Sequence, residues 1–524
     1  MTPLPSVPQQ LVEAVTQRPA DTLLTFLDTG QDFSNADVLQ EALRWSAALQ
    51  QLGVRPGETV VAMLPPCPAA VFEWLGTAWL GALEVPLNTE YRGNMLAQVV
   101  NNARARVAVV SAQYLGRFAD IAEKLEHLKV IVVADADEGT ASGLEIVHGP
   151  KLLAGTPPAT GLTTPRREDV AAVIYTSGTT GASKGVVMPW GVLPTHSASF
   201  GPVTGRGFRF YSTWAMFHCA GKAGVTDAIS RGGTLILRQR WRTDQFWSDV
   251  RASGATSTGF LGGISNFIWS QPERPDDADN PLEHVLMAPV IPQYLAFERR
   301  FGLKIHTGFA SSEAGMPTSC PSPVPNHRTC GRLVPGYQIR LVDAQGNEVG
   351  PNTVGEALVR AEDRDTMFRG YLNMPEKTAE AWEGGWFHSG DGLVRDEDGN
   401  YYFVDRVKDS IRRRGENISS FEVENEVNAH PEVLESAAVE AKGEDGDGEV
   451  MVFVVRHPGA DLQPQALVEF LVPRMPRFMV PRFVEFVDAL PKTHTNRTRK
   501  IELRNRGVGA STWDRVAAGF VLAR

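Results

Sequence analysis

Short runs of apolar residues, separated by segments with helical spacing, recur through the first third of the chain. The runs at 58–64, 106–111 and 129–136 are apolar almost throughout, and residues 68–83 carry apolar side chains at the spacing of a helix. Strands that are apolar on both faces are typical of a parallel sheet that helices cover on both sides. We therefore predict an α/β fold.

The length of the chain and a change in its pattern indicate more than one domain. With 524 residues the chain is too long for one ordinary hydrophobic core. Residues 336–360 have the pattern of two antiparallel strands joined by a turn, and a helix, two strands and a second helix follow residues 401–409. We place a boundary near 406–409, which gives an N-terminal domain of residues 1–407 and a C-terminal domain of residues 408–524.

Composition excludes several classes of protein. The formal net charge of -10 argues against nucleic acid as the main partner. The 4 cysteines include no CxxC pair, so we expect neither a disulfide framework nor a structural zinc site. The first residues lack the features of a signal peptide and no apolar run is long enough to span a membrane, so we expect a cytoplasmic protein.

A loop rich in glycine and hydroxyl groups follows the apolar strand that ends at Tyr175. From Thr176 to Gly185 it reads Thr-Ser-Gly-Thr-Thr-Gly-Ala-Ser-Lys-Gly. Backbone N–H groups and hydroxyls in such a loop can face an anion, and Lys184 adds a positive charge. The spacing differs from that of a Walker A loop. A flexible loop without a ligand is the alternative, but the density of hydroxyls and the closing Ser-Lys-Gly favour phosphate binding.

This loop resembles the signature loop of the adenylate-forming superfamily, which includes acyl-CoA synthetases, nonribosomal-peptide adenylation domains and luciferases. Further motifs follow in the same order and at similar spacing, so the resemblance covers nearly the whole chain. It implies a large N-terminal domain of stacked α/β layers and a small, mobile α+β C-terminal lid. It also implies that the loop binds ATP and AMP through Thr176, Ser177, Gly178, Thr179, Thr180, Gly181 and Lys184.

The segment from Thr307 to Ala314 resembles the Tyr-Gly-x-Thr-Glu segment of the superfamily. The resemblance implies that the ring of Phe309 lies against adenine, that Ser312 contacts a phosphate and that Glu313 holds Mg²⁺. A carboxylate is the hard oxygen ligand that magnesium prefers. Taken alone, Ser-Ser-Glu would more often begin a helix. The residues implied to bind the nucleotide here are Gly308, Phe309, Ala310, Ser311 and Ser312.

Two later segments resemble the ribose-binding and hinge motifs. The segment 386–392 contains Asp391, which the resemblance assigns to the ribose hydroxyls, because an ionised carboxylate accepts two hydrogen bonds well. A Gly-Asp-Gly turn is the alternative. Arg406 would be a second ribose contact, and Lys408 stands where the lid pivots. The basic run 412–414 is either a solvated face or a contact for the phosphates of coenzyme A.

The segment 216–222 resembles the one that lines the acyl pocket, which implies a role for His218. Lys222 suits an acid with a second polar or anionic group, and an exposed lysine is the alternative. Near the C-terminus, the catalytic lysine of the motif Pro-Lys-Thr-x-Thr-x-Lys falls on Arg497, with Lys500 three residues later. The candidate catalytic residues are therefore Glu313, Arg497, Lys500 and Lys184.

The sequence after this motif is most similar to the branch that contains crotonobetaine/carnitine-CoA ligases. The resemblance implies ATP-dependent adenylation of a small acid, release of pyrophosphate and transfer of the acyl group to coenzyme A, with Mg²⁺ as the metal. Two alternatives stay open. One is the same fold acting on another acid or acceptor, such as nitrite in a diazotising relative, and the other is a non-catalytic nucleotide-binding protein. The acid and the oligomeric state, including a homodimer, are left open by the sequence.

Overall fold

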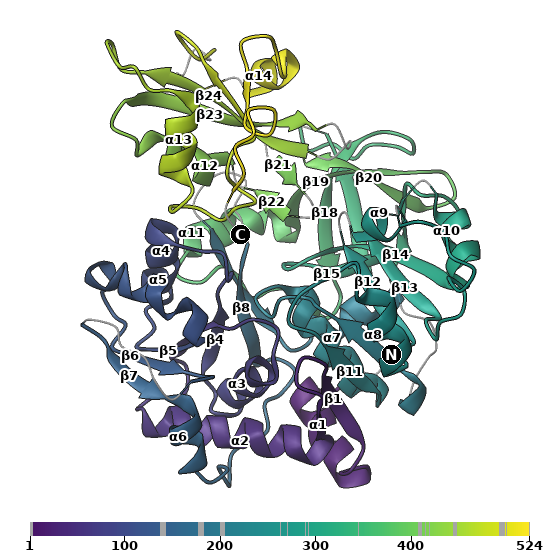
Figure 1. Ribbon diagram of the computed structural model, residues 1–524. Coiled ribbons are helices and arrows are strands. Elements are labelled where there is room, and N and C mark those ends of the chain that lie inside the picture. The colour runs from purple at the N-terminus through teal and green to yellow at the C-terminus, as the bar shows by residue number, and fades with distance from the viewer. Residues whose placement is uncertain are drawn as a thin grey trace. The chain divides into compact units, whose positions relative to one another are not determined.

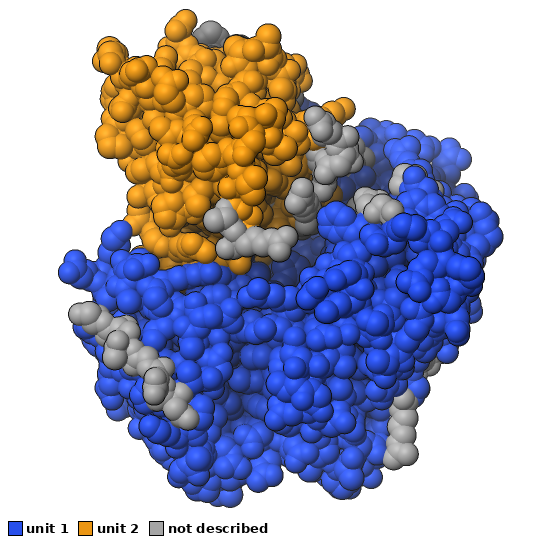
Figure 2. Space-filling model, in the orientation of Figure 1, with its two compact units in different colours: residues 1–89, 100–175, 185–405 blue, residues 90–99, 176–184, 406–524 orange. Residues whose placement is uncertain are grey.

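The computed structural model describes residues 4–136, 143–176, 183–199, 205–261, 264–269, 271–288, 290–291, 293–343, 345–406, 411–413, 416–418, 420–443, 448–491, 498 and 500–522. The chain divides into two compact units, coloured separately in Figure 2. Unit 1 comprises residues 1–89, 100–175 and 185–405, and unit 2 comprises residues 90–99, 176–184 and 406–524. The predicted domains of residues 1–407 and 408–524, and the functions assigned to them, stay predictions.

The strands of unit 1 build two main sheets (Figure 1). Within the described residues, the larger sheet has 13 strands, which are parallel from β1 to β14 except at the edge strand β2 and antiparallel beyond β14. Their order is β17 (Tyr337–Val342), β18 (Gly355–Ala361), β19 (Phe387–Arg395), β20 (Asn400–Arg406), β16 (Thr329–Leu333), β15 (Gly315–Cys320), β14 (Lys304–Ser311), β13 (His284–Ala288), β12 (Ser257–Leu261), β10 (Arg209–Ser212), β11 (Thr234–Leu237), β1 (Thr22–Phe26) and β2 (Gln31–Ser34).

The second sheet confirms the parallel arrangement predicted for the first third of the chain. Its strands are β4 (Leu83–Pro86), β3 (Thr59–Met63), β5 (Val107–Val110), β6 (Val130–Val133) and β7 (Glu145–His148), all parallel. The predicted helix at 68–83 is α3 (Pro68–Trp79), which ends earlier than expected because β4 already begins at Leu83. A separate pair consists of β8 (Val170–Thr176) and β9 (Lys184–Pro189).

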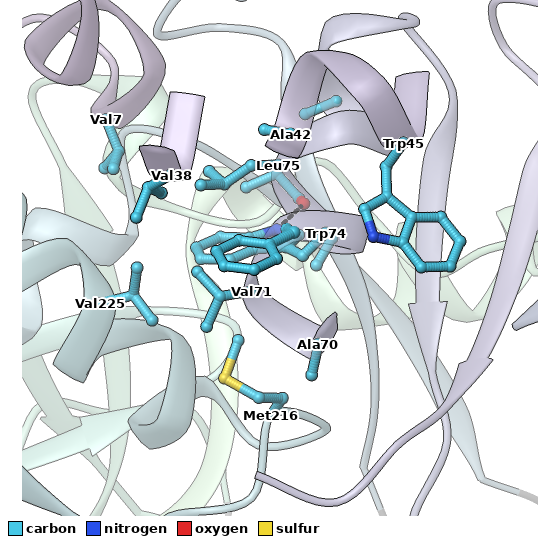
Figure 3. Packing of buried hydrophobic residues seen from close by; sticks show 14 of the residues in the cluster. Val7, Val38, Ala42, Trp45, Ala70, Val71, Trp74, Leu75, Met216 and Val225 are labelled. Atoms are coloured by element: carbon cyan, nitrogen blue, oxygen red, sulfur yellow. Dashed lines mark hydrogen bonds between the residues drawn. The ribbon is translucent and has the colours of Figure 1, made fainter. Parts of the chain in front are cut away.

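Helices alternate with these strands along the chain, and several of them contribute buried side chains to the main core. They are α1 (Val7–Gln17), α2 (Asn35–Gln51), α3, α4 (Gly93–Ala103), α5 (Leu115–Ala119), α6 (Gly149–Ala154), α7 (Cys219–Arg231), α8 (Phe246–Ser253), α9 (Ile264–Trp269), α10 (Tyr294–Phe301) and α11 (Pro375–Ala381). In the core, Trp74 Nε1 donates to the carbonyl of Ala171 at 2.6 Å, so α3 is tied to β8 (Figure 3). Its ring stacks on Trp190 with centroids 5.0 Å apart. Apolar side chains around Trp74 exclude water from this contact.

Unit 2 confirms the predicted order of a helix, two strands and a helix. Its sheet has the order β23 (Val433–Lys442), β24 (Gly448–Arg456), β25 (Phe483–Phe486) and β26 (Trp513–Asp514). The hairpin β21 (Ile411–Arg413) and β22 (Glu416–Ile418) and the helices α12 (Ser420–Asn428), α13 (Pro464–Leu471) and α14 (Lys500–Arg506) complete it. The chain therefore has the expected fold, a large α/β N-terminal domain and a smaller C-terminal domain. Among the described helices, none has both the length and the apolar character that crossing a bilayer demands.

Candidate functional site

The predicted phosphate loop connects two paired strands. β8 ends at Thr176 and β9 begins at Lys184, and both residues are half-buried. Ser177, Gly178, Thr179, Thr180 and Gly181 lie outside the described residues. The structure thus gives the ends of the loop, while phosphate binding by its residues stays a prediction.

A tyrosine that sequence reasoning missed links β9 to Glu313. Val186 in β9 pairs with Tyr371 across an isolated bridge, and Tyr371 Oη donates to Oε1 of Glu313 at 3.2 Å. The backbone N–H of Phe368 also donates to the carbonyl of Glu313 at 2.8 Å. The strand that begins at Lys184 and the candidate metal ligand Glu313 therefore contact the same residue. A signal existed, since a tyrosine among apolar neighbours requires a polar partner for its hydroxyl.

The segment that carries Glu313 is a tight turn between β14 and β15. Ser311 Oγ accepts a hydrogen bond from the N–H of Ala314 at 3.0 Å, and β15 begins at the next residue, Gly315. A helix start, the alternative considered for Ser-Ser-Glu, is therefore excluded. Gly315 has φ +64°, and a Cβ there would lie 2.3 Å from Thr195 Oγ1, so both backbone angle and space require glycine.

Four further residues of this segment that are assigned to nucleotide binding lie in the turn or directly before it. Phe309 is only 8% exposed, and its ring stacks on Phe403 with centroids 6.3 Å apart. Gly308 is half-buried, Ala310 is exposed and Ser312 is buried. The contact of Phe309 with adenine stays a prediction.

The chemistry of Glu313 fits a magnesium ion. Its side chain is half-buried and offers carboxylate oxygens, the donors that Mg²⁺ prefers. Within the described residues, no group of three or more His, Cys, Asp or Glu side chains could form a cage around a metal. Mg²⁺ is usually bound by one or two carboxylates together with substrate phosphates and waters. Glu313 would therefore hold the ion against a bound triphosphate, where the ion would neutralise phosphate charge.

Asp391 lies in strand β19 at an irregularity of the pairing. The side chain is 4% exposed, and its backbone N–H donates to Ser389 Oγ at 3.1 Å. The next N–H towards the N-terminus, of Gly390, donates to Oε1 of Glu356 at 3.1 Å. The register between β18 and β19 shifts at this point. Asp391 is thus held in a strand and not in a free turn, and its contact with ribose stays a prediction.

The hinge and lid residues are only partly visible. Arg406 is the last residue of β20, but its side chain is not described, and Lys408 and Arg497 lie outside the described residues. Lys500 begins α14 in unit 2. Its ammonium lies 2.6 Å from Oε1 of Glu424 and donates to Ser420 Oγ at 2.7 Å. Lys500 is therefore held by partners within its own unit.

His218 lies at the start of α7 beside a thiol that the sequence did not single out. His218 caps the helix, accepting from the N–H of Ala220 at 3.3 Å, and its Nδ1 lies 3.8 Å from Cys219 Sγ. Burial alone would raise the pKa of Cys219, but His218 and a hydrogen bond from Ser312 outweigh it and lower the pKa. His218 and Ser312, predicted from separate motifs, therefore meet at Cys219.

A second histidine lies near His218. Burial, together with the neighbouring His218, lowers the pKa of His196 to about 4, so its ring is neutral at physiological pH. Its Nε2 has no hydrogen-bond partner among the described residues. His196 belongs to the turn η3 (Leu193–Ser199), which also carries Thr195, the neighbour of Gly315. It was missed because a lone histidine in a loop carries no signal of its own.

Lys222 is fully buried, so the interpretation as an exposed lysine is wrong. Its Nζ lies 2.5 Å from Oε2 of Glu84 in β4 and 4.1 Å from the ring centroid of Trp74 in α3, and the two charged side chains are 0% and 2% exposed. Its ammonium thus has an internal partner. The assignment of Lys222 to the acid pocket stays a prediction.

A second carboxyl group lies in the same place. Thr77 Oγ1 donates to Oε1 of Glu73 at 2.8 Å, whereas Oε2 has no hydrogen-bond partner among the residues described. Burial, with a contribution from Glu84, raises the pKa of Glu73 to about 8. Burial also raises the pKa of Glu84 and lowers that of Lys222, each against the attraction of the other. We call Glu73, Glu84 and Lys222 the buried charge cluster.

Comparison with known proteins identifies two matching family models. The model described as AMP-binding enzyme matches residues 11–372, and the model described as AMP-binding enzyme C-terminal domain matches residues 422–497. The crotonobetaine/carnitine–CoA ligase of Salmonella paratyphi A is 30% identical over 506 residues, 90% of this chain and 93% of the relative. The ligase of the same name from Salmonella typhimurium is 30% identical over 501 residues, with the same coverage of both chains.

Solved structures share the fold at lower identity. A double mutant of o-succinylbenzoate CoA synthetase from Bacillus subtilis superposes with a TM-score of 0.83 at 18% identity, covering 98% of this chain and 100% of that one. An amide bond synthetase from Marinactinospora thermotolerans has a TM-score of 0.81 at 23% identity, covering 96% and 99%. These likenesses establish the fold and leave the chemistry to the residues.

Proposed function

The chain belongs to the AMP-binding enzyme family, and from this premise we propose that it activates a small carboxylic acid with ATP and transfers the acyl group to coenzyme A. Its relatives and its fold are those of AMP-forming acyl-CoA ligases, so the protein is a ligase. The observation that carries the proposal is the link from β9 through Tyr371 to Glu313. This link supports the proposal because β9, which begins at Lys184, and Glu313 both contact Tyr371.

In the first half-reaction, an oxygen of the acid attacks the α-phosphorus of ATP. The bond to the β-phosphate oxygen breaks, and pyrophosphate leaves with the electron pair. Two anions must approach each other, so positive charge around the phosphates lowers the barrier. The phosphate loop with Lys184 would bind the phosphates, and a lid cation, Arg497 or Lys500, would contact the acid and the α-phosphate. Bound Mg²⁺ would supply further neutralising charge.

In the second half-reaction, the thiol of coenzyme A attacks the acyl carbon and AMP leaves. Asp391 and Arg406 would keep the ribose in place through both steps, and Phe309 would lie against adenine. His218 would line the acid pocket. Rotation of the lid about Lys408 would exchange the lid cation for the thiol, as expected where domains move between two half-reactions. We also propose a cytoplasmic location, because both co-substrates are cytoplasmic metabolites.

Pyrophosphate release tests the proposal. The protein is incubated with ATP, Mg²⁺ and a panel of carboxylic acids, with and without coenzyme A, and both pyrophosphate and thioester are measured. We expect acid-dependent release of pyrophosphate and a thioester only when coenzyme A is present. Release without a thioester would support another acceptor, and absence of release with every acid would contradict adenylation.

A different acceptor is the second candidate. A protein named amide bond synthetase shares the fold of this chain with a TM-score of 0.81, which motivates a test of amines as acceptors. Adding a panel of amines beside coenzyme A decides between the two. Amide products in the absence of thioester would favour this candidate.

A further inference from the structure

We propose that the buried charge cluster positions the first turn of α7, and with it His218 and Cys219, at the acid pocket. Lys222 acts in this arrangement as an internal counter-ion and not as a ligand of the acid. The inference rests on the proposed function, because that function assigns the pocket to this turn. It makes Glu73, Glu84 and Lys222 positioning residues of the acid site.

The helix connects the cluster directly to the pocket. Lys222 follows the N-cap residue His218 by four residues, so it lies one helical turn further along α7. The N–H of Lys222 lies 3.5 Å from the carbonyl of His218, and the N–H of Gly221 donates to that carbonyl at 3.0 Å. A displacement of Lys222 therefore moves the backbone that carries His218.

The turn is held on two sides. On one side, Ser312 in the segment that carries Glu313 is hydrogen-bonded to the thiol of Cys219. On the other, Nζ of Lys222 is fixed at 2.5 Å from Glu84. The first turn of α7 thus lies between the segment that contains Ser312 and strand β4. The ion pair between Lys222 and Glu84 sets how closely the helix approaches β4.

The ammonium of Lys222 has two partners within the protein. Glu84 pairs with it and the ring of Trp74 covers it at 4.1 Å. Removing one member of a buried pair takes the counter-ion from the remaining partner, and the contact that holds the helix is lost. A lysine in this setting determines geometry, because its buried ammonium is already paired with the carboxylate of Glu84.

Glu73 adds a signature that a purely structural ion pair lacks. The groups that face it are Thr77 on its own helix, Glu84 from β4 and Lys222 from α7. Below its pKa of about 8 the carboxyl of Glu73 is neutral, and it adds no charge beside the pair of Glu84 and Lys222. Above that pH a buried anion appears on Glu73, which weakens the hold on α7. The KM for the acid should therefore rise through this pH.

The decisive variants are Lys222→Met and Glu73→Gln, with Arg300→Met as the matched control. Arg300 forms a buried pair with Asp277 in the same unit, Nε to Oδ2 2.6 Å, with side chains 9% and 7% exposed. It belongs to α10 and not to α7. The control therefore also breaks a buried ion pair but leaves the acid pocket untouched.

Steady-state release of pyrophosphate gives the first readout. We expect Lys222→Met to raise the KM for the acid about tenfold or more while the KM for ATP is unchanged. Arg300→Met should lower the melting temperature without changing the KM for the acid. Glu73→Gln, which keeps the oxygen that accepts from Thr77, should abolish the rise of that KM above its pKa. An equal effect of Lys222→Met and Arg300→Met, or a wild-type pH profile in Glu73→Gln, would overturn the proposal.

A second readout is independent of the reaction. The rate at which Cys219 is alkylated is measured by peptide mass spectrometry in all three variants. We expect faster labelling of Cys219 in Lys222→Met than in Arg300→Met, because its turn is no longer held. If the wild type releases no pyrophosphate with any acid, the proposed function fails, while the labelling still decides whether the cluster holds the turn. If Lys222→Met does not fold, the Glu73→Gln variant decides alone. Its readouts are then the pH dependence of Cys219 labelling and the pH dependence of the KM for the acid.

Discussion

The substitution Gly221→Ala tests the packing that places His218 in the site. Gly221 lies in the first turn of α7, and a Cβ there would be 2.2 Å from the carbonyl oxygen of Ala215 and 2.7 Å from its carbonyl carbon. Ordinary contact of a Cβ begins near 3.4 Å. Both atoms are backbone, so they cannot swing aside as a side chain would. The first turn of α7 and the preceding backbone at Ala215 must therefore move apart by about 1 Å.

The displaced carbonyl of Ala215 is hydrogen-bonded to His218, the residue that we propose lines the acid pocket. The N–H of His218 donates to the same carbonyl of Ala215 at 3.0 Å, so a shift there moves His218 directly. Overpacking of this kind costs about 1–3 kcal/mol. A misplacement of about 1 Å near reacting groups lowers catalysis up to about 100-fold. We therefore expect a lower melting temperature and a fall of roughly 10- to 100-fold in kcat/KM for the acid.

Gly116→Ala is the matched control. Gly116 belongs to α5, and a Cβ there would meet no atom within 4 Å. Alanine favours a helix over glycine by up to about 1 kcal/mol, so the control should be as stable as the wild type or slightly more so. Both variants are assayed by acid-dependent pyrophosphate release and by thermal unfolding. Wild-type kcat/KM and melting temperature in Gly221→Ala would refute the reasoning.

Four further substitutions test the proposed roles. Glu313→Gln should lower adenylate formation about 100-fold in a pyrophosphate assay, and a normal rate would remove the magnesium role. Lys408→Pro fixes φ at the pivot, so thioester formation should slow while adenylation stays normal, and equal losses would reject the hinge. Of Arg497→Ala and Lys500→Ala, we expect the former to impair adenylation more, because Lys500 already pairs with Glu424 at 2.6 Å. If neither is impaired, the lid supplies no catalytic cation.

The fold was predictable where local pattern decides it. Strands such as β3, β5 and β6 are buried on both faces, and their apolar runs require a covered parallel sheet whatever the neighbours are. The end of α3 was less predictable. Residues 80–83 continue its apolar composition, but Gly81 has φ +74°, the left-handed conformation that commonly ends a helix, and β4 begins at Leu83.

The candidate site was predictable in its motifs but not in its contacts. Glu313 and Lys184 could be named from local sequence, because the residue types needed for phosphate and metal stand close together in the chain. Tyr371, which pairs with Val186 of β9 and donates to Glu313, lies far from both in sequence, and contacts of this kind depend on the folded backbone. Cys219 was visible in the sequence, but its lowered pKa depends on Ser312, which another motif supplies.

Lys222 illustrates that charged residues in buried elements are best interpreted as a group. From the sequence, Lys222 was interpreted either as a residue of the acid pocket or as an exposed residue. Its actual partner, Glu84, stands in an otherwise apolar strand. Glu73 likewise stands in an apolar helix. Charged residues in buried elements are almost always paired, so the carboxyl groups of Glu73 and Glu84 are expected near the ammonium group of Lys222. One of the two carboxyl groups is then left without a charged partner. That carboxyl is stable in the interior only when protonated, which is the state that the pKa of about 8 for Glu73 describes.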